Sequence, residues 1–519
     1  MKLAGTLDRL DDLLNPIVVK ELRQAVKSRI VMAALMLFLV IQLVILLFAL
    51  SFDDRRAMDR DLTNLHAGRE IFQVLQGILL GTCMLLVPAY AGIRLAAEHS
   101  DTNVDLLFIS TLRPRGIIAG KLQASIVLIL LIFSACAPFM TFTYLLRGID
   151  IPSIVLVLVL DFLAVLLGTQ GAIFLGSVPA NAGLKLMLGL VGLGALGTLF
   201  GNAMAASIEL LDMGLGSRMD TLAFWLVAGA LVIVILGVIG LLFTWSVAIV
   251  SPASSNRVLP VRLYLLGFWL LTAGAAALLT YYFYQPLPLY LWMDSMTALL
   301  CGLMLIAINE REQWGFRVKR TIPRRRWLRG PLFLLYSGAA GGILFLVLLI
   351  LLTITLPSLA LAYWSDFFAS PLGRATLEAN YRNTLTLAFL ALYTFDYCMT
   401  AVWLRSVLLA GPIKTAYTWV IALVLWALGI ALPWPLLFLL RNDEWRMGQA
   451  SPWWQVSNPF STIYTCVWEH GAEAAVFRER CLVFLSIWAL GVSLACMPWM
   501  IRQMHRFQPP EKTPLAASR

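Results

Sequence analysis

Three aspartates lie inside long apolar runs of the sequence, where an ionised side chain needs either a partner or a function. They are Asp161, Asp294 and Asp396. Carboxylates in such places carry protons or ions through membrane carriers. Asp161 and Asp294 lie within about three helical turns of the ends of their runs, which favours a polar bundle interior or a paired neighbour. Asp396 is more central, and an ion or proton relay competes evenly with a paired structural carboxylate.

A second chemistry-bearing stretch lies near the N-terminus, at residues 15–29, and reads NPIVVKELRQAVKSR. Asn15 is a good N-cap and Pro16 suits the first position of a helix. At 100° per residue the apolar side chains, Leu22 among them, share one face of about 120°, and Glu21 and Arg23 fall on the polar face. The pattern predicts an amphipathic helix at the cytoplasmic membrane surface. A plain basic stop before a membrane helix is the alternative.

A third stretch, residues 98–121, predicts a short helix on the water side of the membrane. Its apolar and flanking side chains are Asp105, Leu106, Leu107, Phe108, Leu112 and Arg113, and Pro114 ends the helix. A helix of about three turns is too short to cross a bilayer. Bulky apolar groups on the water side instead suit a groove on a partner protein, with an interfacial helix resting on lipid as the alternative.

Enzyme chemistry is not expected of this chain. The nearest approach to a nucleotide-binding P-loop, residues 116–122, is one residue short, lacks the final Ser or Thr and begins an apolar run. No spacing of Ser, His, Asp or Cys indicates a nucleophile set, and none indicates a metal site. We therefore expect no catalytic residue, no metal ligand and no cofactor bound by the chain itself.

The composition explains where these stretches must sit. Of the 519 residues, 60% are hydrophobic and 13% are charged, and the mean hydropathy is +0.83. Soluble domains are about 45–50% apolar and about 25% charged, so lipid must be the solvent for most of the chain. The net charge of +10 then indicates the cytoplasmic membrane side rather than nucleic acid.

Twelve apolar runs are long enough to span a bilayer, which predicts an all-α polytopic helical bundle with six spans in each half. The runs are 30–50, 71–97, 116–146, 152–178, 182–203, 222–248, 261–284, 288–308, 332–356, 383–404, 415–440 and 481–501. Placing both termini in the cytoplasm puts 27 of the 39 Lys and Arg residues inside, as the positive-inside rule requires. In the Gly-rich fifth run, Gly197 and Gly201 predict close helix packing.

Together, the segment 15–24 and the segment 105–121, which ends in Gly120-Lys121, resemble the ABC transporter permease of the type-2 exporter class. The resemblance covers roughly residues 1–250. It implies that 1–29 forms the elbow helix, that 30–250 forms a six-span permease core, and that the coupling helix at about 103–113 docks into an ATP-binding subunit. ATP and Mg would then be used by that partner.

The resemblance fades after residue 250, so two interpretations of residues 251–505 stay open. Either this second six-span region is a degenerate second permease, or six spans have been added to a six-span core; residues 506–519 form a cytoplasmic tail. The basic segment 309–331 lies where a second coupling helix would be but lacks the Leu-Leu pattern. Other expected partners are the lipid of the cell inner membrane and a second permease chain, either a copy of this one or another.

Two other functions remain in competition with the exporter permease. One is a twelve-span secondary transporter that uses Asp396 as its relay, and the other is a membrane scaffold that transports nothing.

Overall fold

The computed structural model describes residues 16–56, 67–98, 113–145, 149–179, 181–212, 218–252, 255–364, 371–407, 415–433, 435, 453–468 and 472–510. Within these ranges the regular structure is helical and contains no strand. Eleven helices in the described part of the chain are long and apolar enough to cross a membrane. The chain is therefore an all-α, multi-pass membrane bundle, as the apolar runs predict. The twelfth predicted span, 415–440, is represented by a 14-residue helix, α17 (Thr418–Ala431), and its remainder lies mostly outside the described residues.

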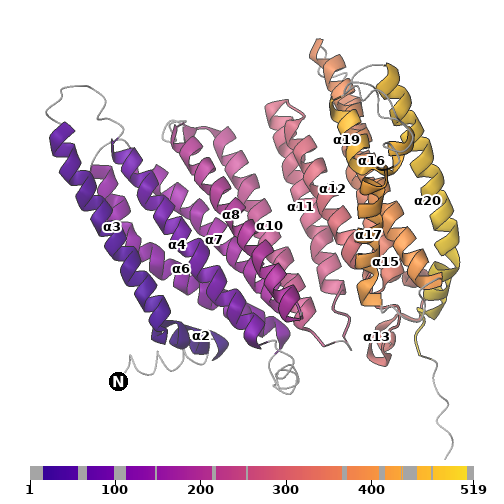
Figure 1. Cartoon of the computed structure of the whole chain (residues 1–519), viewed down its shortest axis with the longest axis horizontal. Coiled ribbons are helices and arrows are strands. Elements are labelled where there is room, and N and C mark those ends of the chain that lie inside the picture. The colour runs from indigo at the N-terminus through magenta and orange to yellow at the C-terminus, as the bar shows by residue number, and fades with distance from the viewer. Residues whose placement is uncertain are drawn as a thin grey trace, which may run out of the picture. The chain divides into compact units, whose positions relative to one another are not determined.

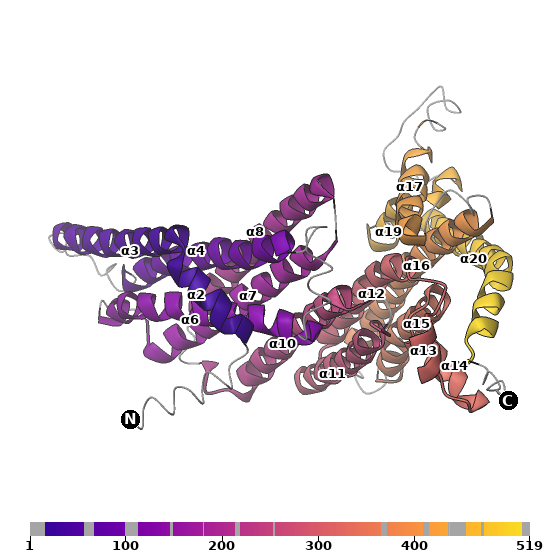
Figure 2. The ribbon, with the colours of Figure 1, turned by 90° about the horizontal axis from the view of Figure 1, so that it is seen from below.

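The chain divides into two compact units, Met1–Pro252 and Ala253–Arg519. The N-terminal unit contains a short helix and six long ones: α2 (Pro16–Lys27), α3 (Arg29–Arg56), α4 (Ala67–Glu98), α6 (Pro114–Leu145), α7 (Ile151–Ser177), α8 (Ala182–Asp212) and α10 (Leu222–Val250). Figures 1 and 2 show α2 lying crosswise at the end of this unit where α4 ends and α6 begins. We call that end of the unit its foot.

The C-terminal unit contains long membrane helices and several short ones. Its helices are α11 (Leu259–Phe283), α12 (Leu287–Ala307), α13 (Phe316–Thr321), α14 (Arg326–Leu335), α15 (Ala339–Trp364), α16 (Pro371–Val407), α17, α19 (Pro459–Trp468) and α20 (Ala472–Arg506). The short helices α13 and α14 lie in the connection between α12 and α15, and we call the end of the unit where that connection lies its foot.

Local sequence explains where several of these helices begin. Asp150 caps α7, accepting hydrogen bonds from the Ser153 backbone N–H at 3.3 Å and from the Ser153 hydroxyl at 2.7 Å, and Pro152 stands in the first turn. Thr221 caps α10 in the same way, through the Phe224 N–H. Beyond the caps, the long helices expose bulky apolar side chains on their outer faces, such as Met36, Leu186 and Leu359. Such exposure is stable in lipid and not in water.

The two units share the central part of their helix packing. Six long helices are compared in the described part of the N-terminal unit, and five long helices with the shorter apolar helix α17, taken as the fifth, in that of the C-terminal unit. The second helix packs against the first, third, fourth and fifth in both units. The fourth packs against the second, third, fifth and sixth in both. The central pair in each unit is therefore its second and fourth helices, α4 with α7 and α12 with α16.

The α4–α7 contact depends on glycine. A β-carbon added at Gly176 would lie 2.5 Å from the Gly92 carbonyl oxygen, and one added at Gly92 would lie 2.9 Å from the Ala172 carbonyl oxygen. Both obstacles are backbone atoms, which cannot rotate out of the way. Small residues thus let these two backbones touch, as in other membrane helix pairs.

The glycines of α8 behave differently from our expectation. Nothing described lies within 4 Å of a β-carbon placed at Gly197 or Gly201. The prediction that these two residues mediate close packing is therefore wrong for contacts within the described chain, because α4 and α7 meet α8 along another face.

We expect Gly176→Ala to lower the stability of the N-terminal unit by about 1–3 kcal/mol, because the added methyl group must push α4 and α7 apart. Gly171→Ala, on the same helix, is the matched control, since its β-carbon meets nothing within 4 Å. The measurement is unfolding of the detergent-solubilised protein in denaturant. Equal stability of the two variants would contradict the proposed close contact.

Candidate functional site

The amphipathic helix α2 turns a charged residue toward the protein. Its buried stripe is Val18, Glu21 and Ala25, at helical spacing on one face. Leu22 is half-buried, and Arg23 and Val26 are exposed. The sequence analysis placed Glu21 on the outward polar face. In the structure Glu21 is instead buried, with 4% of its surface exposed, because cationic side chains of α4 and α6 lie next to it.

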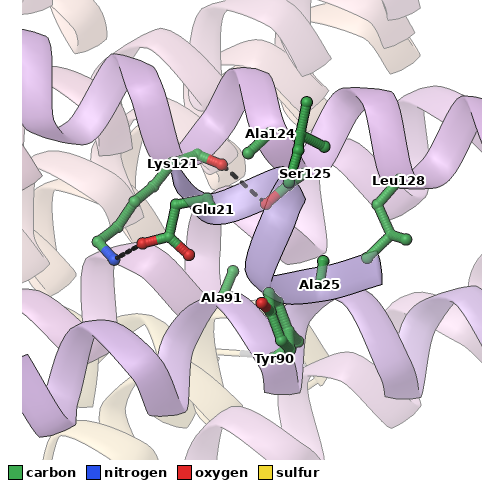
Figure 3. A pocket seen from close by; sticks show the side chains of 9 residues that line it. Glu21, Ala25, Tyr90, Ala91, Lys121, Ala124, Ser125 and Leu128 are labelled. Carbon is green, nitrogen blue, oxygen red and sulfur yellow. Dashed lines mark hydrogen bonds and ion pairs between the residues drawn. The ribbon is translucent and has the colours of Figure 1, made fainter. Parts of the chain in front are cut away.

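Those partners form an ion-pair cluster that we call the clasp: Lys20, Glu21, Arg94, Glu98 and Lys121. The Lys121 ammonium lies 2.8 Å from a carboxylate oxygen of Glu21 and 2.8 Å from one of Glu98. Arg94 lies 3.4 Å from Glu21, and Lys20 lies 3.5 Å from Glu98. Figure 3 shows Glu21 of α2 facing Lys121 of α6.

The clasp follows from the cost of burying charge. Lys121 is 4% exposed, so its ammonium has lost most of its hydration, and two carboxylates within bonding distance replace that hydration. Arg94 lies 4.8 Å above the ring of Tyr90 and also donates to the Gln24 side chain. Through Glu21, α2 is therefore attached by ion pairs to both α4 and α6.

A pocket lies beside the clasp, lined by Glu21, Leu22, Ala25, Tyr90, Ala91, Lys121, Ala124, Ser125 and Leu128. Its walls are mostly apolar, and the Ser125 hydroxyl donates to the Lys121 carbonyl oxygen at 2.9 Å. The lining carries the ion pair but no nucleophile with an adjacent base.

The clasp brackets the segment that the sequence analysis proposed as a coupling helix. Glu98 is the last residue of α4, and Lys121 lies two turns into α6. Asp105, Leu106, Leu107, Phe108 and Leu112 lie outside the described residues, as does Asn15 of the predicted elbow helix. Arg113 is described and exposed, and its carbonyl oxygen accepts from the Gly116 N–H at 2.8 Å as α6 begins. Pro16 begins α2.

Sequence reasoning missed the partners of Lys121. The signal was present, because a lysine inside the apolar run 116–146 requires a counter-charge. The sequence could not show that the Glu21 side chain faces Lys121, because Glu21 is one of several charged residues on α2.

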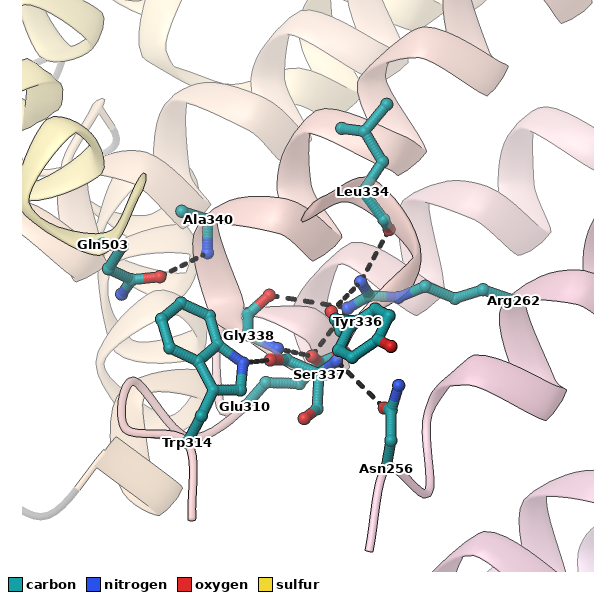
Figure 4. A network of polar contacts seen from close by, with 10 residues as sticks. All are labelled: Asn256, Arg262, Glu310, Trp314, Leu334, Tyr336, Ser337, Gly338, Ala340 and Gln503. Atoms are coloured by element: carbon teal, nitrogen blue, oxygen red, sulfur yellow. Dashed lines mark hydrogen bonds and ion pairs between the residues drawn. The ribbon is translucent and has the colours of Figure 1, made fainter. Parts of the chain in front are cut away.

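The C-terminal unit carries its own polar network at its foot, centred on Arg262 and Glu310 (Figure 4). Arg262 of α11 donates to both carboxylate oxygens of Glu310, at 2.6 and 2.7 Å, and to the carbonyl oxygens of Leu334 and Tyr336, at 2.7 and 2.6 Å. Glu310 also accepts from the Gly338 N–H at 2.7 Å. The arginine is 5% exposed, so here again a buried charge is fully paired.

This network makes the connection 308–338 a common anchor for the C-terminal unit. Glu312 of the connection accepts from Arg405 of α16 and, at 2.9 Å, from the Trp499 indole of α20. Asn309 accepts from the Trp419 N–H of α17 at 2.9 Å. Since α12 and α15 run directly into the connection and α11 supplies Arg262, all six membrane helices of the unit attach to it.

Among the three aspartates predicted inside the membrane, Asp396 of α16 is the one whose side chain has no hydrogen-bond partner among the described residues. Its side chain is fully buried, and neither carboxylate oxygen has a hydrogen-bond partner in the described part of the chain. By contrast, Asp161 of α7 accepts from the Gln76 side chain at 2.8 Å. Asp294 of α12 is exposed on its helix and interacts with Asn383.

Comparison of the chain with protein-family models, with curated proteins and with solved structures finds no match. The function must therefore be argued from the residues and their geometry.

We expect Glu21→Gln to reduce the free energy of unfolding by about 2 kcal/mol. That is less than the roughly 3–5 kcal/mol for a buried charge left wholly unpaired, since Glu98 still contacts Lys121. Glu209→Gln is the control, because Glu209 is exposed on α8 of the same unit. Equal stability of the two variants, measured by denaturant unfolding in detergent, would show that the clasp does not hold α2.

Proposed function

We propose that the chain is the membrane-spanning permease subunit of an ATP-driven exporter. An ATP-binding-cassette subunit docks on the segment 103–113, binds ATP and Mg, and moves that segment during its cycle. The permease itself catalyses nothing. It lies in the cell inner membrane, with its N- and C-termini in the cytoplasm, and needs no nucleic acid partner.

The observation that carries this proposal is the position of the clasp. The two helices that flank the segment 99–112 are the same two helices that α2 contacts. Lys20 and Glu21 of α2 pair with Glu98 and Arg94 of α4, and Glu21 also pairs with Lys121 of α6. A displacement that reaches the ends of α4 and α6 would therefore move α2 with them or break the buried Glu21–Lys121 pair. That coupling is what a permease needs if a partner's motion is to change access across its spans.

The repeated packing pattern supports a doubled permease rather than a core with unrelated added spans. Both units place their second and fourth membrane helices at the centre and attach the same neighbours to them. Both also concentrate buried ion pairs at the foot where their second and third membrane helices are joined. On this proposal one chain supplies both halves of the transport path.

The test is a charge introduced into the proposed docking segment. Leu106→Glu with Leu107→Glu should release a P-loop protein of about 25–35 kDa, within the ordinary size of one or two domains, that co-purifies in gentle detergent. Leu13→Glu with Leu14→Glu is the matched control, since that Leu-Leu pair also lies on the predicted cytoplasmic side. Release by both pairs, or by neither, contradicts docking at 103–113.

Asp396 favours a second candidate, a secondary transporter with a proton or ion relay. A fully buried carboxylate with no bonding partner is costly to ionise, so it takes up a proton or a cation readily. Nothing in the exporter proposal uses this side chain. A scaffold that transports nothing would use neither Asp396 nor the docking segment.

The relay candidate predicts that Asp396→Asn abolishes proton movement driven by a membrane potential in proteoliposomes, read with an internal pH-sensitive dye. Asp294→Asn, a carboxylate change on an exposed face of α12, should leave that movement within about twofold of the unaltered protein. If the unaltered protein moves no protons, the relay candidate fails and the exporter proposal is unaffected.

A further inference from the structure

The acidic side chains of the connection 308–338 are already paired with arginines outside it. Between residues 309 and 331 the acidic residues are Glu310 and Glu312, against eight Lys and Arg. Glu310 is bound to Arg262, and Glu312 to Arg405. Both carboxylates are thus neutralised by arginines of membrane helices, and the basic side chains of the connection are left without acidic residues of their own segment to balance them.

The basic side chains share their surface with exposed aromatic rings. Phe316 is 62% exposed and Trp327 is 70% exposed. The Arg320 guanidinium lies 4.9 Å above the ring of Phe316, and Arg317 and Arg324 are also exposed. Tryptophan beside arginine at the end of a membrane span is typical of the lipid headgroup region.

Helix α14 shows which way this surface faces. Its Phe333 is 4% exposed and packs against Trp314 and Phe507, which forms the protein side of the helix. A different side of the same helix exposes Trp327 and Pro331. Since α15 begins at Ala339, only a few residues after α14, this outward apolar side lies at the level of the membrane surface.

Two further arginines at the same foot, Arg257 and Arg311, lie close enough for their charges to repel each other. Arg257 is half-buried, and its pKa is lowered by that burial and by the nearby charge of Arg311, with Glu310 offsetting the effect only in part. The neighbouring Asn256 accepts from the Ser337 N–H at 3.2 Å, which fixes Arg257 beside the connection. An anion from outside the chain would relieve this repulsion.

We propose that the surface formed by residues 311–329 binds the headgroups of anionic phospholipids. Their phosphates pair with the arginines of α13 and the loop after it, while Trp327 and Phe316 enter the boundary between headgroups and acyl chains. Because the connection 308–338 attaches to all six membrane helices of the C-terminal unit, lipid bound here holds the foot of that unit. This inference does not depend on the exporter proposal.

The experiment uses the full chain, purified in detergent without any partner, and titrated with phosphatidylglycerol or phosphatidylcholine. Bound lipid is counted by native mass spectrometry. We expect a preference for phosphatidylglycerol that Arg317→Glu with Arg320→Glu reduces by about tenfold, since each basic residue near an anionic surface adds to the attraction. The control is Arg502→Glu with Arg506→Glu, which makes the same charge change on exposed residues at the end of α20 and should keep most of the preference.

A milder pair, Arg317→Gln with Arg320→Gln, and the single change Trp327→Ala guard against misfolding of the charge-reversed protein. The milder pair should reduce the preference in the same direction, and Trp327→Ala should weaken the binding of both lipids, while thermal stability in detergent stays unchanged. The proposal is overturned if the preference survives both arginine variants. It is also overturned if the control variant loses as much, or if the surface binds an acidic protein and shows no preference between the two lipids.

Discussion

A charge buried in an apolar bundle must be paired, and that constraint organises both units of this protein. In the N-terminal unit Lys121 is held by Glu21 and Glu98. In the C-terminal unit Arg262 is held by Glu310 and by two carbonyl oxygens at the end of α14. In each case the partners come from segments far apart in sequence. The cost of separating them is what ties the short surface helices to the ends of the membrane helices.

The same constraint concentrates buried ion pairs at the foot of each unit, while the helices beyond the foot are joined by apolar packing and by hydrogen bonds such as that between Gln76 and Asp161. The close contact between Gly92 and Gly176 also lies toward the foot of the N-terminal unit, where α4 and α7 both end. At the foot, motion of one element is passed to several others through ion pairs. A partner acting on the connection between the second and third helices of a unit therefore acts at the point of strongest attachment.

The sequence was sufficient for the fold because length and hydropathy dominate in lipid. The apolar runs predicted the all-α bundle, and Pro16 correctly marked the start of α2.

The sequence was not sufficient for contacts that depend on how each helix is rotated about its own axis. Glu21 shares its helix with four other polar or charged residues between Lys20 and Lys27, and helical spacing alone assigned it to the wrong face. Gly197 and Gly201 have the spacing of a packing motif, yet the close contact is made by Gly92 and Gly176. Gly168, Ala172 and Gly176 repeat the same four-residue spacing, so spacing alone does not show which small residues face a neighbouring helix. Asp396 was recognisable from its central position, but the lack of a partner depends on which side chains of α12, α15, α17, α19 and α20 face it.

The central claim is that a partner docks on the segment between α4 and α6 and that the clasp passes its motion to α2. Hydrogen–deuterium exchange of the full chain, with and without its co-purified P-loop subunit, tests this most directly. The account predicts slower amide exchange in peptides covering 99–113 when the subunit is bound, and an ATP-dependent change in exchange across α2. Unchanged exchange in both segments, with the subunit demonstrably bound elsewhere on the chain, would contradict it.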